Sequence, residues 1–189
     1  MPLYLSRSST SAAPFELASG EDTFDRRLMN VQGIDPTSGF IMGSVFRATK
    51  TETTTQVLVR TGSTACAATP TTCKIGLYTV DDPSTMDLTR VAVTANDTTL
   101  FAATNTDYTR SWAASTTKVA GTLYAVCVLM VSAVATAKFT GLSTSVAGHE
   151  GDKPFYGFYS ASGQTDLPAT ITGATLTGWY LQAYAQVLP

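Results

Sequence analysis

The sequence predicts an all-β fold, an antiparallel β-sandwich or jelly roll, on the strength of three observations. Roughly one residue in six is threonine, a β-branched residue that favours strands. Short apolar runs recur from residue 40 onward, and turn-forming residues separate them. Glu and Lys are too sparse to line exposed helices with ion pairs. With 189 residues, the chain can bury one sizeable core and still carry a short arm.

The first 38 residues differ from the rest of the chain. They are rich in serine, contain a charged stretch at 21–27, and show no sustained period of 2 or 3.6 residues. We expect residues 1–38 to form an extended N-terminal arm that docks on neighbouring subunits. An ordinary, partly ordered terminus is the alternative. Residues 39–189 are then the β-sandwich domain.

The expected strands follow one another at irregular spacing. Val57 and Val59 lie on one face of the second strand, and Val91 and Val93 alternate in the fourth. The turn sequence Asp-Asp-Pro-Ser at 81–84 ends the third. In chain order the expected strands are 40–48, 53–61, 74–80, 88–95, 107–113, 123–131, 154–159 and 176–187. About eight or nine strands suit two packed antiparallel sheets.

The longest uncharged run, 119–137, approaches the roughly 20 residues that a membrane span needs. Four small or polar residues interrupt it, and it is rich in Val and Ala where spans favour Leu. The chain also has no second run of this kind and no basic cluster that would set an orientation. We therefore expect no membrane span, and predict that 123–131 is a strand buried on both faces.

The charge of the chain bears on its partners and its origin. The net charge is −2, the pI is about 5.2, and there is no basic run, so a nucleic-acid partner is not expected. Charged residues make up 14% of the chain, against about 25% in ordinary domains. This low charge is typical of a protein that hides surface against neighbours. The first residues lack the basic and apolar regions of a signal peptide, so we expect synthesis in the cytoplasm.

Few residues are candidates for chemistry. The single histidine, His149, stands beside Glu150 and Asp152, where it could bind a metal or act as a base, although a solvated loop is the favoured interpretation. One histidine excludes the common multi-histidine zinc sites. There is no nucleophile elbow, P-loop or dinucleotide fingerprint. A paired-carboxylate hydrolase is disfavoured. We expect no enzyme activity, no cofactor and no metal.

Three cysteines occur. Cys66 and Cys73 are close enough in sequence for a disulfide if their Cα atoms approach within about 6 Å, and two thiols are the alternative. Cys127 lies within an apolar run and is expected to be a small core residue.

Aromatic residues gather in two short stretches. Such residues can stack on sugars or pack on another subunit, but core residues of a sandwich have the same pattern. The candidates for surface contacts are Phe155, Tyr156, Phe158 and Tyr159. The second stretch holds Trp179, Tyr180 and Tyr184.

The order of several segments suggests a family. The segments are 69–80, 88–101, the strand with Tyr108, 119–126 and 164–169, and together they span most of 50–189. In this order they resemble a family of minor tail proteins from phages of actinobacteria. The resemblance implies a β-sandwich in the virion, near the tail tip or in a fibre-like appendage that contacts the host surface. It implies no catalytic residues, and residues 1–38 lie outside it.

The expected partners follow from this resemblance. They are other virion proteins, reached through the arm, and further copies of the chain in a homo-oligomer, with a trimer favoured by analogy with other phage appendages. A host cell-wall glycan is a further candidate. A capsid decoration or head-fibre protein and a carbohydrate-binding module are the alternative functions.

Overall fold

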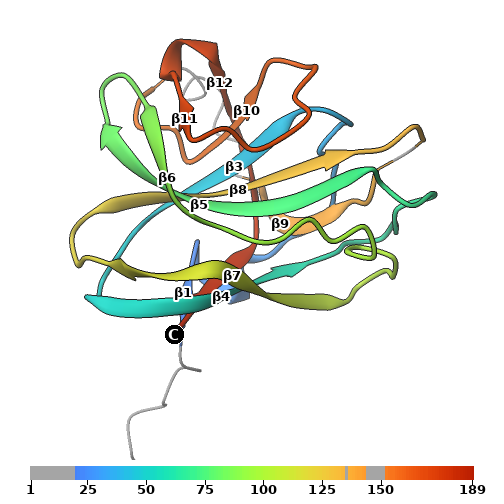
Figure 1. The fold of residues 1–189 in the computed structure, drawn as a ribbon, viewed down its shortest axis with the longest axis horizontal. Coiled ribbons are helices and arrows are strands. Elements are labelled where there is room, and N and C mark those ends of the chain that lie inside the picture. Colours follow the sequence, from blue (N-terminus) through green and yellow to red (C-terminus); the bar gives the residue numbers. More distant parts are fainter. Residues whose placement is uncertain (1–19, 135, 144–151) are drawn as a thin grey trace, which may run out of the picture.

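A computed structural model describes residues 20–134, 136–143 and 152–189, and this part of the chain is an antiparallel β-sandwich (Figure 1). Seven strands form the largest sheet, in the order β11 (Thr170–Ile171), β6 (Asp87–Val93), β5 (Thr72–Asp82), β8 (Leu123–Val131), β3 (Ile41–Arg47), β10 (Gly157–Ser160) and β12 (Leu176–Trp179). Four form the facing sheet, in the order β1 (Glu21–Asp22), β14 (Ala185–Leu188), β4 (Glu52–Arg60) and β7 (Asp107–Lys118).

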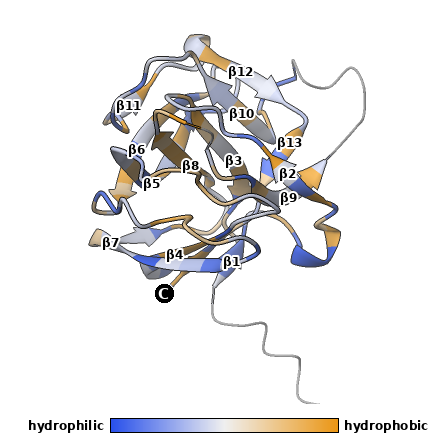
Figure 2. Ribbon diagram, turned by 90° about the vertical axis from the view of Figure 1, so that its right-hand side faces the viewer, coloured by the Kyte–Doolittle hydropathy of each residue, from blue (hydrophilic) through white to orange (hydrophobic). Residues whose placement is uncertain are grey.

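A third, smaller sheet lies at the side of the sandwich (Figure 2). Its strands, in order, are β13 (Leu181–Ala183), β9 (Phe139–Ser143) and β2 (Val31–Ile34). Two short 3-10 helices complete the described elements, η1 (Arg26–Leu28) and η2 (Gly173–Thr175). The strand pairs of the described residues are all antiparallel.

The seven-stranded sheet has an apolar core on each of its two faces. One cluster fills the space towards β4, β7 and β14, and includes Val57 and Val187. The other lies on the opposite face, where the sheet curls (Figure 2), and it takes side chains from β10, β11 and β12. It includes Phe158 and Ile171.

Strand β8 contributes to both clusters, which explains its sequence. Val126 and Val128 point into the first cluster, and Ala125 and Cys127 into the second. A strand buried on both faces reads as a continuous apolar run rather than an alternating one. The prediction for 123–131 is therefore confirmed, with the same bounds. In the described part of the chain, no helix has the length and apolar character that crossing a membrane requires.

The other long strands also match the prediction to within a few residues, apart from three differences. The strand expected at 107–113 continues to Lys118. The strand expected at 154–159 begins at Gly157. The single strand expected at 176–187 is wrong, because this segment forms β12, β13 and β14, each in a different sheet. Strands β1, β2, β9 and β11 were not predicted.

The described part of the expected arm, residues 20–38, takes part in the sheets of its own chain. Strand β1 pairs with β14, and β2 pairs with β9. The sandwich therefore begins before residue 39. Residues 1–19 lie outside the described residues, so docking of the arm on neighbouring subunits stays a prediction.

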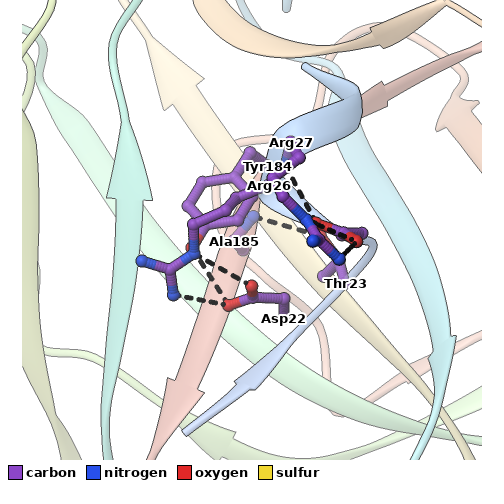
Figure 3. Close-up of polar contacts among 7 residues, drawn as sticks. Asp22, Thr23, Arg26, Arg27, Tyr184 and Ala185 are labelled. Atoms are coloured by element: carbon purple, nitrogen blue, oxygen red, sulfur yellow. Dashed lines mark hydrogen bonds and ion pairs between the residues drawn. The ribbon is translucent and has the colours of Figure 1, made fainter. Parts of the chain in front are cut away.

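Polar contacts fasten β1 to the end of the chain (Figure 3). The Arg26 guanidinium donates two hydrogen bonds of 3.2 Å to the Asp22 carboxylate, which also accepts one of 3.0 Å from the Tyr184 hydroxyl. Thr23 exchanges backbone and side-chain hydrogen bonds with Ala185. Burial and the neighbouring Asp22 carboxylate raise the pKa of Tyr184, so its hydroxyl stays a donor.

A buried ion cluster holds the other side of β1. Lys118 Nζ lies 2.6 Å from Glu21 Oε2 and 2.7 Å from Glu52 Oε1, and its side chain is fully buried. Burial acts to raise the pKa of Glu21, but hydrogen bonds from Lys118 and from the Thr49 amide outweigh it and lower that pKa. Burial likewise acts to lower the pKa of Lys118, and the two carboxylates outweigh it, so the pKa is raised. Glu21 and Lys118 are therefore both charged at neutral pH.

Candidate functional site

A pocket of about 270 Å³ lies at one end of the seven-stranded sheet. It lies where β3, β10 and β12 meet the loop between β2 and β3. The residues that line it are Asp35, Pro36, Thr37, Phe40, Met42, Tyr159 and Trp179.

The strand register places these residues together. Tyr159 on β10 is paired with Met42 on β3, and Trp179 on β12 is paired with Gly157, two residues before Tyr159. Since residues two apart share one face of a sheet, Tyr159 and Trp179 point to the same side. Phe158, between them in register, points to the opposite face and is fully buried in the second cluster.

The rings in and beside the pocket meet edge to face. Phe40 and Tyr159 have centroids 6.2 Å apart at 60°, and Tyr159 and Trp179 have centroids 5.8 Å apart at 85°. Tyr180 continues the row, 6.4 Å from Trp179 at 72°. The three lining rings are half-buried and the Met42 beneath them is buried, so each ring keeps part of its surface for a ligand. Edge-to-face pairs of this kind fix the ring orientations.

A carboxylate stands at the polar side of the pocket. Asp35 accepts a hydrogen bond of 2.8 Å from Lys138 Nζ and one of 3.1 Å from the Thr136 hydroxyl, and its side chain is about half exposed. Each carboxylate oxygen can accept more than one hydrogen bond, so Asp35 has acceptor capacity left. Thr37 is exposed on the same loop. The pocket thus combines apolar ring surface with polar atoms at its rim, an arrangement that suits the binding of a ligand.

The aromatic residues singled out in the sequence separate into two groups. Phe155 and Phe158 are core residues of the second cluster. Tyr156 is 67% exposed, and Tyr159 lines the pocket. The candidate surface contacts are thereby narrowed to the two tyrosines. Trp179 belonged to the second aromatic stretch of the sequence, and no local signal pointed to Phe40 or Asp35.

The cysteines are thiols in the structure, and the possible bridge between Cys66 and Cys73 stays a prediction. Cys66 is partly buried beside the first cluster, to which Cys73 belongs. Burial, followed by the proximity of Cys66 and Asp97, raises the pKa of Cys73 to about 12. Cys127 is a buried core residue, as predicted. His149 lies outside the described residues.

Neither a cluster of metal ligands in the described residues nor a matching sequence points to a chemistry for this chain. Within residues 20–134, 136–143 and 152–189, no group of three or more His, Cys, Asp and Glu side chains is placed to hold a metal ion. No protein-family model and no curated protein sequence matches the chain.

Proposed function

We propose that this chain is a non-catalytic structural protein of a tailed-phage virion, a minor tail protein of the tail tip or of an appendage that contacts the host. Two kinds of support lead to it. Several segments between 50 and 189, in their order along the chain, resemble those of minor tail proteins of phages that infect actinobacteria. The sandwich that these segments form is rigid without a cofactor, since strand hydrogen bonds and burial on both faces of one sheet stabilise it.

The observation that carries the proposal is the outer face of β4 and β7. Charge is nearly absent from it. Its side chains are Thr53, Thr55, Gln56, Leu58, Thr109, Ser111 and Thr117. Thr55 and Gln56 are both outside the core because the register of β4 with β7 shifts between Thr54 and Gln56. The charged residues that β4 and β7 place on this face are Arg60 and Asp107, which form an ion pair of 2.8 Å. A second ion pair, Asp22 with Arg26 at 3.2 Å, adjoins the face on the side of β1. The central parts of protein interfaces are depleted of charged residues, so this face suits contact with neighbouring subunits.

The position of β7 strengthens this interpretation. It is a twelve-residue strand at the edge of its sheet. Along the edge that faces away from β4, an isolated β-bridge joins Trp112 to Thr94. Exposed edge strands usually carry charges or proline that prevent pairing with other chains. The exposed residues Ala113, Ala114 and Ser115, where the register of β7 with β4 shifts, carry neither a charge nor proline. We propose that copies of the chain assemble through this face into a homo-oligomer, a trimer by analogy with other appendages.

Incorporation into particles tests the proposal. Thr109→Lys places a charge at the centre of the outer face, where strand pairing and the core are unaffected. When the parent phage encodes this variant, we expect its particles to lack the variant chain. The matched control is Thr170→Lys on β11, at the far end of the other sheet, which we expect to be incorporated normally. Equal incorporation of both variants would contradict a subunit contact through β4 and β7.

The location of the chain separates the proposal from its alternative. A capsid decoration or head-fibre protein could use the same fold and the same uncharged face. Antibody labelling of intact particles distinguishes the two, because a minor tail protein is labelled at the tail and a decoration protein over the head.

A further inference from the structure

We propose that the pocket lined by Phe40, Tyr159 and Trp179 is a binding site for a neutral pyranose saccharide. Such a ligand has an apolar face of C–H groups and a rim of hydroxyls, and the pocket presents a matching pair of surfaces. The proposal does not depend on where the chain resides, and it concerns a part of the molecule that is distinct from the uncharged face of β4 and β7.

The apolar half of the match comes from the rings. Their edge-to-face angles of 60° and 85° mean that the rings cannot all lie parallel, so they surround the space above Met42 instead of forming one flat wall. Trp179 and Tyr159 are half-buried, with their orientations fixed by contact with each other. A pyranose ring stacked on either side chain would bury C–H groups against the ring surface at a small entropic cost to the protein.

The polar half comes from the Asp35 carboxylate. It is held by Lys138 and Thr136 at 2.8 Å and 3.1 Å, so its oxygens have fixed positions at the pocket wall. Hydroxyl groups of a saccharide can donate to the remaining lone pairs of these oxygens, and charge-assisted hydrogen bonds of this kind are the stronger ones. The ion pair with Lys138 leaves little net charge at the site, which favours a neutral ligand over an anionic or cationic one.

A proline-rich peptide is the competing ligand, because such peptides also bind aromatic surfaces. Recognition of that kind uses an extended groove along which a polyproline helix of three residues per turn lies. Here the rings line a half-open pocket of about 270 Å³ with a carboxylate at its wall. The size and the polar wall fit one sugar residue at the end or within a chain better than an extended peptide.

The test is saturation-transfer NMR on the full chain, with cellopentaose, mannopentaose and lactose as probes and a proline-rich decapeptide for comparison. We expect at least one saccharide to bind with a roughly millimolar dissociation constant. Trp179→Ala and Tyr159→Ala should weaken this binding at least about tenfold, and Asp35→Asn should weaken it while keeping the shape of the pocket. The matched control is Tyr156→Ala, which removes an exposed tyrosine outside the pocket and should leave binding unchanged.

Three results would overturn the proposal. The first is that none of the three saccharides binds. The second is that Trp179→Ala binds a saccharide as tightly as the unmodified chain does. The third is that the decapeptide binds at the pocket and no saccharide competes with it. The urea midpoint of each variant shows whether it is folded. Asp35→Asn, which removes no packed side chain, keeps the test decisive if an aromatic variant does not fold.

Discussion

Replacing the buried cation Lys118 by methionine should cost much of the stability of the fold. The Lys118 side chain is fully buried, with its ammonium 2.6 Å from Glu21 and 2.7 Å from Glu52. Lys118→Met keeps the volume but leaves two carboxylates without their cation. Breaking a buried pair in this way costs about 3–5 kcal/mol. Because the Glu52 side chain is 24% exposed, water can reach part of the site, so we expect the lower end, about 3 kcal/mol.

Urea unfolding measures this cost. With a slope of about 2 kcal/mol per molar urea, the midpoint should fall by about 1.5 M. The matched control is Arg27→Met, which breaks an ion pair with Asp25 of the same 2.6 Å length whose arginine side chain is 86% exposed. That control should leave the midpoint unchanged. Equal midpoints for the two variants would refute the reasoning, because they would show that burial of Lys118 adds nothing to the value of its ion pairs.

Three further predictions concern acid stability, packing and thiol reactivity. The pKa of Glu21 is lowered below its ordinary 4.5, so the stability that its carboxylate contributes is complete above pH 4.5 and is lost as the pH falls below that value. Urea midpoints measured from pH 6 down to 3 should therefore fall less in Glu21→Gln than in the unmodified chain. Gly43→Ala would place a Cβ 2.1 Å from the buried Phe158 ring and should lower the free energy of unfolding by about 1–3 kcal/mol, whereas Gly33→Ala, with open space around it, should not; equal calorimetric melting temperatures would contradict this. Burial raises the pKa of the Cys127 thiol, so an alkylating agent at pH 8 should label it only in denaturant, and labelling of the folded chain would count against the core position.

Long strands were predictable because burial imposes a pattern on them. In β4, Val57 and Val59 alternate with less buried residues because one face of the strand is buried. In β8 the apolar run is continuous because both faces of the strand are buried. Strands of two or three residues, such as β1 and β11, are too short to show any period, and their pairing with β14 and β6 depends on contacts far along the chain. Their existence therefore left no local signal.

The segment from Leu176 to Leu188 shows a second limit. Its apolar and aromatic content indicated one strand, but the chain passes from one sheet to the next at Tyr180 and again at Tyr184. A change of sheet depends on where the partner strands lie, which composition does not reveal. The same limit applies to the pocket, because Asp35 and Phe40 are more than a hundred residues from Tyr159 and Trp179 and meet them only through the pairing of β3 with β10.

If this chain is a structural part of a virion, as we propose, it is present in purified particles. Particles of the parent phage, banded in a density gradient, can be analysed by quantitative mass spectrometry against the capsid protein. We predict peptides of this chain at a constant ratio across the particle peak and in every preparation. Peptides confined to the soluble lysate, with none in the particle peak, would contradict the account.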